Sequence, residues 1–319
     1  MKSKVMVLSA AFVMGVASLS AQTPLWQGKG RIAVSSDGNE HDHDDWAATP
    51  LTLAMIASQG LQDRLVVYTF SDHIWGSNQE VAQLDLEIDG MTAYDHMRAS
   101  ALGGKKWFQF DNSRFVCAVD NANVAYRAMC DAINASSEDN PLFILAAGPM
   151  QVVGEALNMS DMAKRKFVTV ISHSGWNNNH ADEAYSYNDA EWIKAIGDVS
   201  WDNHTGWTFD EMRQAFGSAV GGSVRFVQIA DQNGGKGYDG FCAAKEKFEW
   251  IKSSAARNNK LYKPGSWEWL YSRIATCEKE QGKSFDPSDA GLAFFLLTGI
   301  ERSEPEMARD LLEHPKPRQ

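Results

Sequence analysis

The sequence predicts an α/β fold with an open, mostly parallel sheet, helices on both faces and a helical C-terminal extension. Several short segments are apolar runs, which is typical of parallel strands that are buried on both faces. Helix-like stretches separate these runs, as they do in βαβ units. No Pro/Gly/Ser-rich linker and no internal repeat interrupts the chain, so we expect residues 22–319 to form one domain.

The first half of the chain supplies four predicted strands. Ile-Ala-Val marks a strand at 31–36, Leu-Val-Val-Tyr-Thr-Phe one at 65–70, Phe-Val-Cys one at 114–117 and Phe-Ile-Leu-Ala-Ala one at 141–147. Helices are expected at 45–59, at 78–101 with a break at Gly90, and at 121–135. Another helix is expected after Gly148-Pro149.

The second half supplies two more strands, at 167–172 and 224–229, separated by a polar loop at 173–188. Three helices are then expected, at 242–257, 266–281 and 288–298. The tail from Pro305 is polar, and we expect it to fray.

The N-terminus is predicted to be a secretory signal at residues 1–21. Lys2 and Lys4 precede an apolar segment at 5–19, and the small residues at 18–21 suit cleavage. The segment is short for a retained anchor, and no later stretch is long and apolar enough to span a bilayer. The mature protein is therefore expected to be exported, either periplasmic or secreted.

Charge and cysteine content narrow the partners. The net charge of -11 argues against nucleic acid or an anionic membrane surface, which basic faces bind. A small-molecule substrate is expected, and a homo-oligomer is compatible with the sequence. Export permits two disulfides among Cys117, Cys130, Cys242 and Cys277, but three pairings fit equally well. We expect these cysteines to be structural.

The segment between the first predicted strand and the first predicted helix is highly acidic. It holds five carboxylates and two imidazoles within nine residues, from Asp37 to Asp45. Crowded like charges repel unless a cation or shared protons offset them. Carboxylate oxygens are the ligands that Ca²⁺ and Mg²⁺ prefer, so the segment predicts a hard-metal site. The alternative is a solvated acidic turn in which Asp44 or Asp45 caps the helix.

Polar and aromatic residues follow the other predicted strands. Because the carboxyl ends of parallel strands lie at one edge of the sheet, these loops are expected to face one crevice. Flat tryptophan faces there suit sugar rings and bases. The residues concerned are Asp72, His73 and Trp75 after the second strand, Gln151 after the 141–147 strand, and His173, Trp176 and Asn178 after the 167–172 strand.

Several of these motifs, in the same order along most of the mature chain, resemble the nucleoside hydrolases. Asp37 followed by Asp44-Asp45 looks like that family's N-terminal aspartate motif. The strand ending in Gly148-Pro149-Met150-Gln151 resembles its Gly-Pro-Leu-Thr-Asn strand, and Ser172-His173-Ser174-Gly175 stands where the family has Met-Gly-Gly. Ser186-Tyr187-Asn188 is similar to its Glu-Phe-Asn element, and Ser288-Asp289 stands where its last metal aspartate lies.

The resemblance implies a calcium-dependent glycosidase that hydrolyses an N-glycosidic or related bond. Its ligands for one Ca²⁺ would be Asp37, Asp45, Asp289 and the Gln151 carbonyl, with Asp44 beside the ion and near a sugar hydroxyl. Asp37 would act as general base on the attacking water. Asn178 and Asn188 would orient the sugar, and His73, His173 or His180 would protonate the leaving group.

The chain also departs from the family pattern. Residues 38–43 lengthen the aspartate loop, so Asp37, Glu40 or Asp42 could take the first aspartate's place. Asn39-Glu40 resembles a divergent exported branch. Gln151 replaces a threonine that binds metal through its carbonyl, Ser186 replaces a glutamate, and Asp72 or His73 replaces an asparagine. These departures leave the substrate open between a nucleoside and another glycoside.

Two other functions fit parts of the sequence. His41-x-His43-x-Asp45 matches the metal motif of the metallo-β-lactamase-like hydrolases, which bind zinc, although Trp46 stands where the final histidine is usual. An exported carbohydrate-binding protein could instead keep the fold and the ion without turnover.

Overall fold

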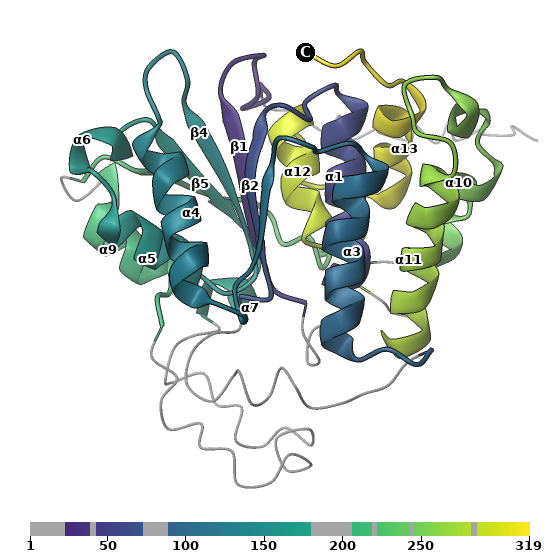
Figure 1. Ribbon diagram of the computed structural model, residues 1–319, viewed down its shortest axis with the longest axis horizontal. Coiled ribbons are helices and arrows are strands. Elements are labelled where there is room, and N and C mark those ends of the chain that lie inside the picture. The colour runs from purple at the N-terminus through teal and green to yellow at the C-terminus, as the bar shows by residue number, and fades with distance from the viewer. Residues whose placement is uncertain are drawn as a thin grey trace, which may run out of the picture.

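The protein contains a six-stranded, all-parallel sheet, seen in the computed structural model (Figure 1), which confirms the predicted fold class. The structure describes residues 23–38, 43–72, 89–179, 206–218, 222–242, 245–281 and 286–319. The strand order is β3-β2-β1-β4-β5-β6. The strands are β1 (Arg31–Ser36), β2 (Leu65–Phe70), β3 (Arg114–Cys117), β4 (Leu142–Ala147), β5 (Val168–Ser172) and β6 (Arg225–Gln228).

Helices cover both faces of the sheet, as Figure 1 shows. One face carries α4 (Ala122–Asn134), α5 (Gln151–Met159), α6 (Met162–Arg165) and α9 (Phe209–Phe216). The other carries α1 (Asp45–Ser58), α3 (Ala93–Trp107), α10 (Trp250–Ser253), α11 (Ser266–Gln281), α12 (Ala290–Thr298) and α13 (Pro305–Glu313). A short α7 (Gly175–Asn179) follows β5.

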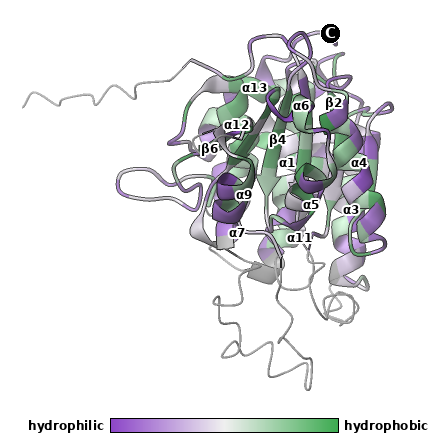
Figure 2. Ribbon diagram, turned by 90° about the vertical axis from the view of Figure 1, so that its left-hand side faces the viewer, coloured by the Kyte–Doolittle hydropathy of each residue, from purple (hydrophilic) through white to green (hydrophobic). Residues whose placement is uncertain are grey.

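The alternation of side chains along each strand builds two hydrophobic cores. In β1, Ile32 and Val34 join the core beneath α1, whereas Ala33 joins the core beneath α4 and α5. A strand projects successive side chains to opposite faces, so an apolar run without polar interruptions fills both cores. Apolar residues lie along the sheet and the inward helix faces in Figure 2, with polar residues outside.

Helix α1 is the central helix of one layer. All of its residues are buried, because α3, α11, α12 and α13 enclose it on the side away from the sheet. A helix enclosed all round has little use for a polar face, and its sequence from Trp46 to Ser58 contains no charged residue. Its first residue, Asp45, is therefore a charge brought into the interior.

The strand order reverses direction between β1 and β4, because β2 and β3 extend the sheet on one side and β5 and β6 on the other. Open parallel sheets bind ligands beyond the carboxyl ends of the strands at such a switch point. Asp37 lies directly after β1 and Gly148 directly after β4. The topology therefore places the acidic segment at the favoured ligand position.

Two C-terminal predictions were wrong. Residues 242–257 do not form one helix: the described part contains 3-10 turns at Lys245–Phe248 and Ala255–Asn258 around α10. Ser254 interrupts the helix because its hydroxyl accepts the backbone N–H of Ala256 from an extended conformation.

The segment from Pro305, expected to fray, forms α13 (Pro305–Glu313) and then a tail that is hydrogen-bonded to the rest of the protein. Proline at the first helical position suits its missing N–H, and Ala308 and Leu312 are buried against the core. Beyond the helix, the N–H of Lys316 donates to Ser58 O at 2.6 Å and that of Gln319 donates to Gly60 O at 2.9 Å.

Other expectations met mixed outcomes. The polar loop predicted at 173–188 contains α7 near its start, and most of it lies outside the described residues. Residues 78–88 of the helix predicted at 78–101 and the signal segment 1–21 also lie outside them. The four cysteines are free thiols in the structure. Within the described part of the chain, no helix has the length and apolar character needed to cross a membrane.

Candidate metal centre

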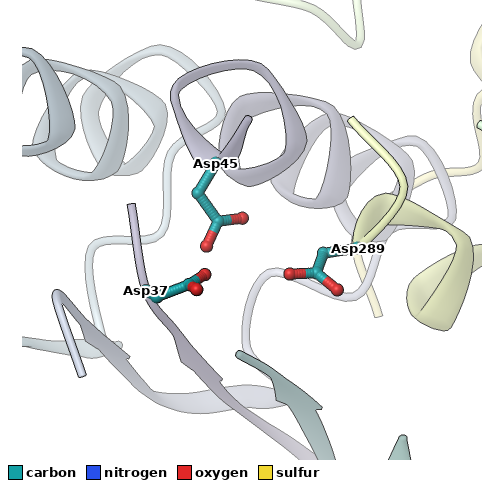
Figure 3. A group of neighbouring side chains, drawn as sticks. All are labelled: Asp37, Asp45 and Asp289. Atoms are coloured by element: carbon teal, nitrogen blue, oxygen red, sulfur yellow. The ribbon is translucent and has the colours of Figure 1, made fainter. Parts of the chain in front are cut away.

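Three carboxylates from two distant parts of the sequence meet at the switch point. Asp37 follows β1, Asp45 begins α1 and Asp289 lies at the N-cap of α12. One oxygen from each lies within 4.8 Å of the others, and the three side chains point toward a shared space (Figure 3). All three residues are at most 4% exposed. The structure thus brings together three of the residues predicted to bind metal.

The local backbone directs these side chains inward. Asp289 makes no capping hydrogen bond to α12, although aspartate commonly caps helices, and its carboxylate faces the other two instead. Asp45 lies in the first turn of α1. The positive ends of both helix dipoles therefore point at the cluster and partly offset its negative charge.

Two glycines permit the close approach of β1, β4 and α1. Gly148 has φ +130°, and a Cβ there would lie 2.8 Å from Asp37 Cγ. Gly38 has φ +94°, and a Cβ there would lie 2.6 Å from Asp45 Cβ. Both positions combine a left-handed backbone with a lack of space, so glycine is required by sterics.

The carboxyl ends of β2 and β5 also carry unusual backbone conformations. Ser71 has φ +56° and Ser174 has φ +64°. Left-handed conformations are unfavourable for residues with a Cβ, and strained residues of this kind cluster at functional sites. Together with Gly38 and Gly148, these serines give each of β1, β2, β4 and β5 a left-handed residue within two positions of its carboxyl end.

The electrostatics of the cluster favour a bound cation. Burial raises the pKa of Asp45 well above its usual value, and the charges of Asp37 and Asp289 raise it further. Asp45 Oδ2 accepts no hydrogen bond from the described residues. Buried like charges are costly unless a cation or protons compensate them. A donor set made only of carboxylate oxygens suits Ca²⁺ or Mg²⁺ better than zinc.

A second layer of side chains fixes the orientation of Asp289. His173 donates through Nε2 to Asp289 Oδ1 at 2.6 Å, and Asn177 donates through Nδ2 to the same oxygen at 2.7 Å. Burial lowers the pKa of His173, but hydrogen bonds to Asp231 and Asp289 outweigh this and raise it to about 9. The backbone N–H of Gln232 lies 3.2 Å from His173 Nδ1, and it can donate to that nitrogen only when the imidazole is neutral. In either state, Nε2–H points at Asp289.

The remaining described candidates lie outside the group of three carboxylates. Asp44 is the N-cap of α1 and accepts the N–H of Asp45 at 2.8 Å, so the alternative capping role fits Asp44. Gln151 begins α5, and its side-chain oxygen accepts the N–H of Trp207 at 2.9 Å. Asn178 is buried and accepts a hydrogen bond from Ser172 Oγ at 3.0 Å. Trp176 lies in α7.

Asp72 is buried beneath the end of β2. Its Oδ2 accepts from Ser35 Oγ at 3.1 Å and from the N–H of Val152, at the start of α5, at 3.0 Å. Oδ1 has no hydrogen-bond partner among the described residues. Burial raises the pKa of Asp72 well above its usual value. Asp72 thus joins β1, β2 and α5 just below the cluster.

Several predicted substrate contacts lie outside the described residues, namely Asn39, Glu40, Asp42, His73, Trp75 and Asn188, as do His41 and His180. Three partners of the site were not predicted from the sequence, namely Asn177, Asp231 and Gln232. Asp231 and Gln232 follow the strand predicted at 224–229, so the rule that strand ends carry the site, applied to that strand, would have found them. Asn177 had no distinguishing signal within its run of asparagines.

The chain is similar to an uncharacterized protein, P22, of Formosa agariphila. The two are 27% identical over 285 residues, which is 88% of each chain. No family model matches the sequence, and no solved structure matches it.

Proposed function

We propose that this protein is a calcium-dependent hydrolase that cleaves an N-glycosidic or related glycosidic bond. The observation that carries the proposal is the convergence of Asp37, Asp45 and Asp289 at the sheet's switch point. They come from two distant parts of the sequence and are buried, and His173 is paired with Asp289 at 2.6 Å. The resemblance to nucleoside hydrolases supports the choice of a glycosidic bond.

The residues present fit a hard divalent cation. Asp37, Asp45 and Asp289 would hold it, and the predicted roles of Asp44 and of the Gln151 carbonyl belong to the same proposal. When bound, Ca²⁺ supplies a positive charge that orients sugar hydroxyls and makes a bound water more acidic. His173 and Asn177 keep Asp289 in place through hydrogen bonds of 2.6 and 2.7 Å.

The chain's own groups would supply the remaining chemistry. Asp37 accepts the proton of the attacking water as general base. The C1–N or C1–O bond then breaks through a state with positive charge on the sugar ring, which neighbouring carboxylates stabilise electrostatically. The leaving group takes a proton from a histidine of the strand-end loops, for which His173 is the described candidate. Its Nε2–H is directed at Asp289, so this role requires that hydrogen bond to open.

The zinc alternative receives no support from the arrangement around His43. The ring of His43 packs edge-on against Trp46 with centroids 4.6 Å apart. Among the described residues, which do not include His41, Asp45 groups with two aspartates rather than with an imidazole.

We further propose that the mature protein is exported after removal of residues 1–21. Intact mass of the protein recovered from outside the cytoplasm tests this directly.

The test of function uses the mature protein with a panel of nucleosides and aryl glycosides. We expect release of free sugar that stops in chelator and returns with Ca²⁺. Asp289→Asn should abolish release, whereas Asp210→Asn, which changes an exposed aspartate paired with Arg213, should not. Calcium binding without release from any substrate would favour a carbohydrate-binding protein. Absence of calcium binding would refute the proposed metal centre.

A further inference from the structure

A tryptophan next to the cluster connects the two chain segments that carry Asp37 and Asp45. Trp46 follows Asp45 and has no exposed surface. Its indole Nε1–H donates to the carbonyl oxygen of Gly38 at 3.2 Å, and Gly38 follows Asp37. The side chain of Trp46 therefore links the backbone next to Asp37 to the backbone next to Asp45.

Helix α3 contacts both the side chain and the backbone of Trp46. The ring of His96 stacks on the indole with centroids 4.5 Å apart and an interplanar angle of 25°. Ser100, one turn further along α3, donates through Oγ to the carbonyl oxygen of Trp46 at 2.7 Å. Both the side chain and the backbone of Trp46 are thus fixed by one helix.

A buried arginine of α11 holds these α3 residues in turn. Arg273 donates through Nε to Ser100 Oγ at 2.9 Å and through Nη2 to the carbonyl oxygen of His96 at 2.9 Å. Arg273 is only 7% exposed. A fork of guanidinium donors that meets two groups on one helix has a fixed geometry, which lysine cannot reproduce.

Cys277, one turn after Arg273, adds a contact to the same segment. Its Sγ donates to the carbonyl oxygen of His43 at 3.1 Å. Helix α11 thus contacts the chain before Asp45 directly through Cys277, and it supports Trp46, after Asp45, indirectly through the bonds of Arg273 to Ser100 and His96. Neither residue belongs to the group of three carboxylates.

We propose that Trp46 is a positioning residue of the cation site, set in place by Arg273 through Ser100 and His96. The indole-to-Gly38 hydrogen bond fixes the separation of Asp37 from Asp45, so it keeps their oxygens together in spite of their repulsion. This inference rests on the proposed function, because it assigns Trp46 a role in binding the same cation. Groups that orient metal ligands typically change affinity by about 10- to 100-fold when they are removed.

The test compares Trp46→Phe with Trp267→Phe. Phenylalanine keeps an aromatic ring but removes the N–H that reaches Gly38. Trp267 is the matched control because it is equally buried, at 1% exposed, and packs against Trp250 and Tyr262 rather than near the cluster. Calcium affinity of the mature protein is measured by titration calorimetry. We expect Trp46→Phe to weaken it by at least about 10-fold, at the lower end of the usual range, and Trp267→Phe to leave it unchanged.

Melting temperatures in calcium and in chelator separate positioning from general stability. A merely structural Trp46 would lower both temperatures equally and leave the calcium-induced increase intact. A positioning Trp46 makes that increase smaller. If Trp46→Phe does not fold, Arg273→Lys and Ser100→Ala provide the same comparison, and each should weaken calcium binding.

The outcomes separate this inference from the function it rests on. Wild-type protein that binds no calcium refutes the proposed metal centre. Wild-type protein that binds calcium, with Trp46→Phe or both substitutes binding it equally well, overturns the positioning role alone.

Discussion

Replacing Asp45 with asparagine should change stability in opposite directions with and without calcium. The ligand oxygens of the three carboxylates lie within 4.8 Å of one another. At an effective dielectric constant of about 20, two full charges at that distance repel by about 3.5 kcal/mol. Asp45 takes part in two such pairs, and because 4.8 Å is the largest separation, its full charge would add at least about 7 kcal/mol of repulsion.

Proton uptake relieves much of this repulsion, because the pKa of Asp45 is raised by burial and by its neighbours. We therefore expect Asp45→Asn to stabilise the protein in chelator by about 1 to 4 kcal/mol, by analogy with the range seen when a buried ion pair is replaced by hydrophobic residues of similar volume. In calcium at about 1,000 times its dissociation constant, the wild type gains about 4 kcal/mol by linkage, and the variant loses most of that gain.

Urea unfolding in chelator and in calcium measures both effects. Asp72→Asn is the control, because Asp72 is equally buried but is not one of the three clustered carboxylates. It should shift stability by the same amount in both conditions. The reasoning fails if Asp45→Asn destabilises the protein in chelator, or if the wild type gains no stability from calcium.

Three further predictions follow from the geometry. Gly148→Ala should lower both stability and calcium affinity, because its Cβ would lie 2.8 Å from Asp37 Cγ. The control is Gly28→Ala, where the backbone is also left-handed (φ +79°) but nothing lies within 4 Å of the added Cβ. This control should cost only about 1 to 2 kcal/mol of stability in urea unfolding. Arg318 lowers the pKa of Asp63 to about 2, so this pair stabilises the fold above the unfolded value of 3.8 and stops doing so as pH falls through about 2. Arg318→Ala should therefore cost up to about 1 kcal/mol at pH 7 and nothing below pH 2, as measured by unfolding at a series of pH values. Titration with a thiol reagent in denaturant and without reductant should find four thiols, and two disulfides would contradict the structure.

The sheet could be predicted from sequence because its signal is local. Each strand is an apolar run that fills two cores, and β1 and β2 begin and end where the sequence indicated. Strand-end reasoning placed Asp37, but its meeting with Asp289, which begins a helix, followed only from the family resemblance. Neither residue's local sequence indicates that the other is its neighbour.

The C-terminal region was predicted less well because its structure depends on tertiary contacts. Residues 242–257 have helical composition, yet Ser254 satisfies its backbone neighbour with its own hydroxyl and interrupts the helix. Helix α13 is short, and most of its stabilisation comes from burying residues such as Leu312 against the core. The polar tail after it looked unstructured because its partners at Ser58 and Gly60 are distant in sequence.

The position of Asp289 near the end of the chain has a consequence for how the molecule matures. Two of the carboxylates are made early, but the third joins them only after α12 has docked beside α1. Closing so long a loop is slow and entropically unfavourable. A divalent ion that needs all three oxygens would bind only a nearly completed molecule, so it would lock the finished fold rather than guide its early assembly.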